Sequence, residues 1–178
     1  MRADEYRKDD TAWALSAYAS ALDNLGRTEE ALAANVEAMT LLPNTPALHR
    51  NRADVLIHAR RLKEAEEDLA HAVELDGNED SPYLWLRRAQ LAIARGNGLL
   101  AKQMLDEVIK RDPSQDVLLQ RAQSAWLLGD LNAAQDGLRQ ALEKANAGDR
   151  IVISREMELL LDEHLNLPGK NEMLNLLS

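Results

Sequence analysis

Apolar residues recur at helical spacing along this chain, in stretches separated by short polar turns. The segment 46–79 shows the pattern clearly, with apolar positions at Leu48, Val55, Leu56, Leu62, Leu69, Val73 and Leu75. This spacing gathers apolar side chains on one face of an α-helix and leaves the other face polar. The pattern predicts a succession of short amphipathic helices and an all-α fold.

Small residues reveal an internal repeat within this pattern. One alanine series has steps of 34, 36 and 33 residues and consists of Ala19, Ala53, Ala89 and Ala122. The same steps separate Ala31, Ala65, Ala101 and Ala134, and also Ala38, Ala72, Val108 and Ala141. A methyl-sized side chain at a fixed place in each helix lets two helix backbones approach closely. The shared period therefore predicts four stacked helix pairs.

Turn signals divide the chain into repeats and flanking segments. The repeats occupy 12–148, as units 12–45, 46–79, 82–114 and 115–148, and residues 1–11 extend the first helix or precede it. Within the units, the breakers between the two helices are Gly26-Arg27, Arg60-Arg61, Gly96-Asn97 and Gly129-Asp130. The remaining segment, 149–178, is predicted to be a C-terminal capping helix with a short apolar tail, because an array end exposes an apolar face. A docking role for 170–178, or the start of a truncated continuation, stays open.

The third unit resembles the tetratricopeptide repeat (TPR) family, whose signature is W-x2-L-G-x2-Y, then A-x3-F, then P, over about 34 residues. Its residues in the Trp, Gly, Tyr, Ala, Phe and Pro positions are Trp85, Ala89, Ala92, Ala101, Leu105 and Pro113. The other units keep the same frame, except that Asn35 stands where the family places a large apolar residue. The resemblance implies a right-handed superhelical α-solenoid of about four helix pairs plus a C-terminal capping helix.

Charge and composition exclude several classes of function. The net charge of −9 disfavours nucleic-acid binding, and the absence of cysteine excludes thiol catalysis and cysteine-ligated zinc. No apolar stretch reaches the length of a membrane span, and the charged start MRADEYRKDD does not read as a signal peptide, so we expect a cytoplasmic protein. The sequence holds no catalytic motif, and we predict neither an enzyme nor a cofactor.

In the TPR family the first helix of each pair lines a concave groove, and this implies a set of binding candidates here. Asn51 and Arg87 also match part of a carboxylate clamp found in one TPR subclass. Aromatic and arginine residues are the types enriched at interface hot spots. The alternative is that Trp13 and Trp126 only pack on neighbouring helices. The candidates are Trp13, Arg50, Asn51, Asp54, His58, Tyr83, Leu86, Arg87, Gln90, Ile93, Leu119, Gln123 and Trp126.

Two classes of function fit these features. The first is a scaffold that binds an extended peptide or an amphipathic helix of another protein in the groove. A narrower form of it is a cytosolic chaperone for secreted partners. The second is a structural protein that forms homo-oligomers through its terminal repeats or its C-terminal segment.

Overall fold

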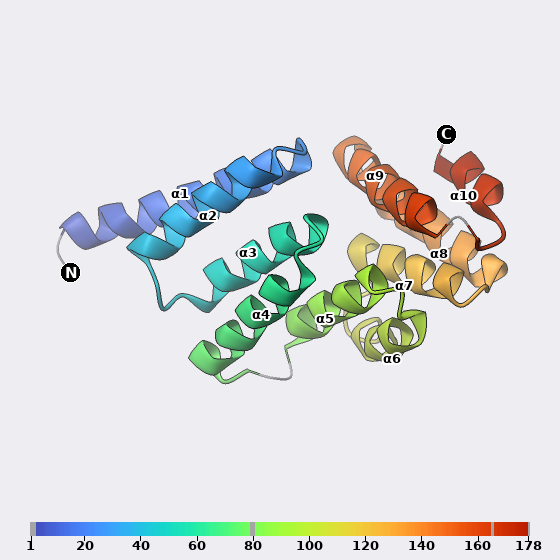
Figure 1. Ribbon diagram of the computed structural model, residues 1–178, viewed down its shortest axis with the longest axis horizontal. Helices are drawn as coiled ribbons and strands as arrows, with labels where there is room; N and C mark the ends of the chain where they lie inside the picture. The colour runs from blue at the N-terminus through green and yellow to red at the C-terminus, as the bar shows by residue number, and fades with distance from the viewer. Residues whose placement is uncertain (1–2, 79–80, 165, 178) are drawn as a thin grey trace. The chain divides into compact units, whose positions relative to one another are not determined.

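The computed structural model describes residues 3–78, 81–164 and 166–177, and these residues form ten α-helices and no strand (Figure 1). Their bounds are α1 Ala3–Asn24, α2 Thr28–Leu41, α3 Pro46–His58, α4 Leu62–Asp76, α5 Pro82–Ala94, α6 Gly98–Val108, α7 Gln115–Leu127, α8 Leu131–Lys144, α9 Ala147–Glu163 and α10 Lys170–Leu177. Helices α1 to α8 pack as four consecutive pairs, which confirms the all-α prediction. The chain divides into two compact units, 1–79 with α1 to α4 and 80–178 with α5 to α10.

The turn inside each pair closes in the same way. The residue directly after the tip donates its backbone N–H to the carbonyl oxygen five residues back, as in Arg27 to Leu22, Arg61 to Leu56, Asn97 to Ala92 and Asp130 to Ala125. This is the Schellman closure of a helix, and it needs a left-handed residue at the tip. Glycine supplies that residue in three pairs, at φ 75°, 72° and 77°, whereas Arg60 adopts φ 59° in the remaining one. The predicted breakers therefore mark the turns, including the one that lacks glycine.

The recurring small residues lie where the helices of a pair touch. Ala19, Ala53, Ala89 and Ala122 are all fully buried. Opposite Ala122, a Cβ added at Gly137 of α8 would lie only 3.2 Å from the Ala122 Cβ. Because that spacing leaves no room for a larger side chain, methyl-sized residues set the distance between α7 and α8.

The second unit gains its largest apolar cluster from the C-terminal helices. Trp126 of α7, Leu138 of α8, Met157 and Leu161 of α9, and Met173 of α10 are all buried in one cluster. Helix α9 begins with a capping box, in which the Asn146 side chain accepts from the Gly148 and Asp149 backbone N–H groups. The C-terminal segment thus folds as a helix pair that covers α7 and α8.

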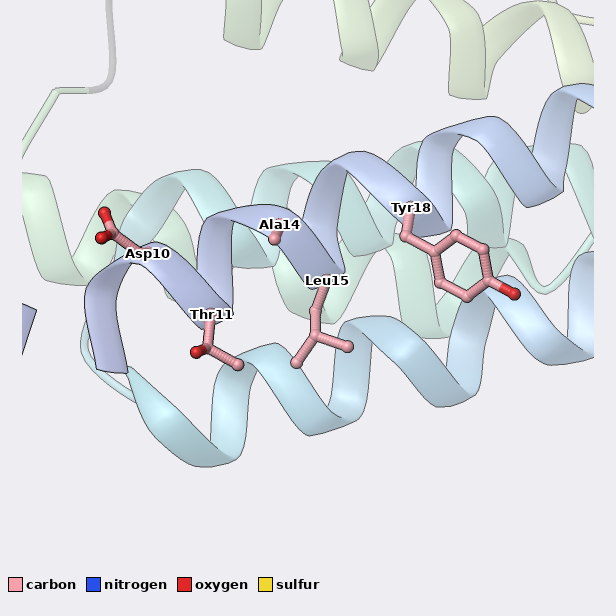
Figure 2. A pocket seen from close by; sticks show the side chains of 5 residues that line it. All are labelled: Asp10, Thr11, Ala14, Leu15 and Tyr18. Carbon is pink, nitrogen blue, oxygen red and sulfur yellow. The ribbon is translucent and has the colours of Figure 1, made fainter. Parts of the chain in front are cut away.

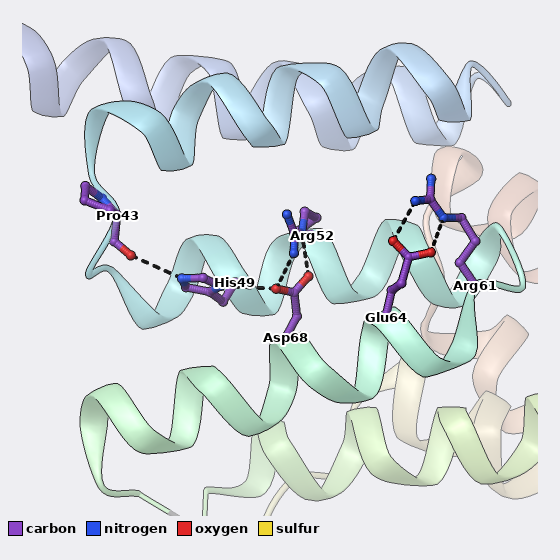
Figure 3. A network of polar contacts seen from close by, with 6 residues as sticks. All are labelled: Pro43, His49, Arg52, Arg61, Glu64 and Asp68. Atoms are coloured by element: carbon purple, nitrogen blue, oxygen red, sulfur yellow. Dashed lines mark hydrogen bonds and ion pairs between the residues drawn. The ribbon is translucent and has the colours of Figure 1, made fainter.

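A buried polar network joins α3 to α4 in the first unit (Figure 3). Asp68, whose side chain is 4% exposed, accepts two hydrogen bonds from the Arg52 guanidinium and lies 3.2 Å from His49 Nδ1. The other ring nitrogen of His49 lies 3.2 Å from the Pro43 carbonyl oxygen. His49 occupies the position of the family's Trp, so a polar bridge replaces apolar packing at this point.

Asn35 is buried on α2 at 1% exposure, and neither of its amide atoms has a hydrogen-bond partner among the described residues. The equivalent positions in the other pairs hold Leu69, Leu105 and Leu138, all buried. Leaving a buried amide unpaired costs about 1–3 kcal/mol. The first helix pair therefore contains one unfavourable position that the others avoid.

Asn35→Leu is expected to raise the free energy of unfolding by about 1–3 kcal/mol, because it removes that penalty and adds apolar contact. Chemical denaturation followed by circular dichroism measures the change. The reciprocal variant Leu69→Asn serves as control and should destabilise the chain. A loss of stability in Asn35→Leu would contradict the interpretation, since it would mean that the site cannot hold the larger side chain.

Candidate protein-binding surface

In the first unit, the first helices of two successive pairs lie side by side and are joined by two polar contacts. Asn51 Nδ2 of α3 donates to Ser16 Oγ of α1 at 2.7 Å. Two helical turns further along, His58 Nδ1 lies 2.5 Å from Asp23 Oδ2. The line where α1 meets α3 is called the α1–α3 seam below.

Four of the predicted binding residues are at least partly exposed along or beside this seam, namely Trp13, Asn51, Asp54 and His58. Trp13 is 45% exposed and stands one turn before Ser16 on α1, so the two side chains share a face of the helix. Asp54 is half-buried, and its spacing places it between Asn51 and His58 on α3. The seam therefore presents one large aromatic side chain beside carboxylate, imidazole and amide groups.

Arg50 points to a different neighbour, because its Nη1 donates to Asp76 Oδ2 of α4 at 2.6 Å. A hydrogen bond from the Asn78 backbone N–H, and then the one from Arg50, lower the pKa of the Asp76 carboxyl below its usual value. Arg50 thus fastens α3 to α4 within its pair.

In the second unit, α5 carries a compact polar and aromatic group. The Arg87 guanidinium lies 4.7 Å from the centre of the Tyr83 ring, and its Nη1 donates to Gln90 Oε1 at 3.1 Å. All three side chains are half-buried. The cation–π contact and the hydrogen bond hold the three side chains together on one face of α5.

Two other α5 candidates are core residues. Leu86 is 8% exposed and packs with Ala89, Leu105 and Val117, and Ile93 is 5% exposed in the cluster around Trp126. The prediction that they line an open groove is wrong, because α6 and α7 take up their apolar side chains.

The structure also corrects the predictions for α7, where Leu119, Gln123 and Trp126 are exposed by only 3%, 4% and 1%. Trp126 Nε1 donates to the Pro168 carbonyl oxygen at 3.2 Å, and its ring meets the His164 ring edge-on at 6.3 Å. His164 and Pro168, which lie between α9 and α10, therefore cover this indole. The packing alternative is correct for Trp126, whereas Trp13 is exposed.

Titratable side chains do not gather into a further site in the part of the chain that the structure describes. No group of three or more histidine, cysteine, aspartate or glutamate side chains could hold a metal ion there. His71 pairs with Glu74 and meets the His49 ring edge-on at 4.5 Å. None of the described helices is long and apolar enough to cross a membrane.

The burial of α7 was missed at the sequence level, although part of its cause was visible there. The apolar positions 153, 157, 160 and 161 predicted that α9 packs against something. Nothing in their spacing identified α7 as the surface that they cover.

The two C-terminal helices are also joined to each other, by an ion pair between Lys170 Nζ of α10 and Asp162 of α9 at 2.7 Å.

Comparison with known proteins supports the fold. The chain is similar to a tetratricopeptide repeat protein from Parabacteroides merdae, with a TM-score of 0.63 and 21% sequence identity over 92% of this chain and 69% of that one. No protein-family model and no curated protein matches the sequence. The likeness confirms the resemblance at the level of fold, and the chain has the helix-pair architecture of tetratricopeptide repeat proteins.

Proposed function

We propose that this chain is a protein-binding scaffold that offers the exposed sides of its first helices to an extended peptide or an amphipathic helix of another protein. The observation that carries the proposal is the exposed Trp13 beside the polar α1–α3 seam. The group of Tyr83, Arg87 and Gln90 on α5 supports it in the second unit. The tetratricopeptide fold agrees with this type of function.

The chemistry of both surfaces suits a peptide. Trp13 and Tyr83 supply large rings that lose little conformational freedom on binding, and rings of this kind dominate interface energetics. Asn51, Asp54 and Gln90 can orient the ligand through hydrogen bonds to its backbone. Because Asn51 is already bonded to Ser16, its amide is held in place before binding.

Truncating either ring is expected to weaken binding of the partner. Trp13→Ala and Tyr83→Ala should each cost about 2 kcal/mol, which is about a 30-fold rise in Kd. The partner is identified by copurification and mass spectrometry, and its binding segment is then titrated by calorimetry. Leu99→Ala is the matched control, since Leu99 is 57% exposed on α6. If all three variants bind the partner's segment with the affinity of the unaltered chain, the proposal is wrong.

A further inference from the structure

Helix α1 has a second exposed face that the proposed binding surface does not use. A shallow pocket of about 400 Å³ lies there, lined by Asp10, Thr11, Ala14, Leu15 and Tyr18 (Figure 2). At about 100° per residue, these positions lie roughly opposite Trp13 and Ser16 on the helix. The pocket therefore belongs to the side of α1 that faces away from α3, called the outer face below.

The equivalent positions in the later repeats show what packs against this face of a first helix. The positions equivalent to Ala14 hold Leu48 in the second pair and Val117 in the fourth, and both are fully buried. Leu48 packs on Ala12 and Ala38 of the preceding pair, and Val117 packs on Leu86 and Leu105 of its own preceding pair. In the second and fourth pairs, the corresponding face of the first helix is therefore covered by the preceding helix pair. In the first pair Ala14 is exposed, and Tyr18 is 54% exposed at the rim of the pocket.

A second copy of this chain is a poor occupant for the outer face. Head-to-tail stacking of the outer face on α7 and α8, in the register of the repeat, is blocked because α9 and α10 cover that end. Head-to-head stacking would bring together two acidic surfaces, because residues 3–41 contain eight acidic and three basic residues. Like charges at a shared interface oppose association.

The same charge excess indicates the complementary partner. The first helix pair accounts for five of the chain's nine net negative charges. Helix α2 contributes Glu29 and Glu37 in addition to Glu30, which pairs with Arg27, and the exposed Asp10 lies in the wall of the pocket itself. We infer that the outer face of α1 binds a basic amphipathic helix of another protein. Its apolar ridge enters the pocket beside Ala14 and Tyr18, and its lysine or arginine side chains meet the surrounding carboxylates.

The test uses a synthetic peptide of about 18 residues with leucine at helical i, i+3, i+4 and i+7 spacing and lysine elsewhere. A peptide of identical composition, rearranged to abolish the apolar face, is the control for binding by charge alone. Tyr18→Arg is the principal variant, because arginine occupies the equivalent positions 52, 88 and 121 in the other pairs and the fold accepts it there. Asp10→Lys is the second variant, and Trp13→Ala reports on the α1–α3 seam.

The inference predicts that Tyr18→Arg and Asp10→Lys each raise the Kd of the amphipathic peptide about tenfold or more, while Trp13→Ala changes it less than about twofold. The rearranged peptide should bind at least about tenfold more weakly, and salt should weaken binding of the amphipathic peptide. Equal binding of the two peptides, or unaltered binding by Tyr18→Arg, would overturn it. Sensitivity to Trp13→Ala alone would overturn it too, while leaving the proposed function intact. A concentration-dependent dimer in light scattering that Tyr18→Arg abolishes would instead make a second copy the occupant.

Discussion

Trp126→Ala is expected to lower the free energy of unfolding of the second unit by about 3–5 kcal/mol, the usual cost of removing a large aromatic side chain from a core. Trp126 is 1% exposed and belongs to one buried cluster with residues from α7, α8, α9 and α10. The substitution would leave a cavity where the C-terminal helices meet α7. It would also leave the Pro168 carbonyl without its donor.

Two measurements check this expectation. Chemical denaturation followed by circular dichroism gives the overall loss, and amide hydrogen exchange shows where it falls. Exchange should accelerate in α9 and α10 more than in α5 and α6, because the two C-terminal helices pack around the indole. Trp13→Ala is the matched control, since Trp13 is 45% exposed and its loss should change stability by less than about 0.5 kcal/mol. A cost for Trp126→Ala as small as that of the control would contradict the burial of α7.

Asp68→Ala is expected to destabilise the first unit by about 2–4 kcal/mol. Breaking a fully buried ion pair costs about 3–5 kcal/mol, and the figure is reduced here because the Arg52 side chain is 29% exposed and can turn to water. The His49 side chain cannot turn to water in this way, because it is only 8% exposed. The variant therefore removes the carboxylate that both Arg52 and His49 contact between α3 and α4.

The neighbouring Arg61–Glu64 pair supplies the control for this experiment (Figure 3). The two ion pairs have similar geometry, but Arg61 and Glu64 both lie at the surface on adjacent turns of the chain. Glu64→Ala should thus have a much smaller effect on the denaturation midpoint than Asp68→Ala. Equal denaturation midpoints for the two variants would show that the buried network contributes no more stability than the exposed ion pair.

The helix pairs could be predicted from the sequence because their cause is repeated along it. Every pair needs a small residue at the helix contact and a left-handed residue at the turn, so four copies of each signal occur in phase. Even Arg60, which is not a glycine, stands where the period predicts a breaker between two helices. The C-terminal helix was predictable from its apolar face, although the surface that it covers was not.

The candidate site was less predictable, because exposure depends on contacts outside the repeat. Trp13 and Trp126 both stand on a first helix of a pair, and no local feature separates them. They differ because His164 and Pro168 cover Trp126, although Pro168 lies 42 residues further along the chain. The bond between His49 and Asp68 was equally invisible, since it joins two helices whose pairing follows only from the fold.

The most direct test of the binding surface is amide hydrogen exchange of the chain with and without its copurified partner. We expect slower exchange in α1, α3 and α5, around Trp13, Asp54 and Tyr83, with α4 and α6 unchanged. Protection confined to α4 and α6, or to α9 and α10, would contradict this expectation.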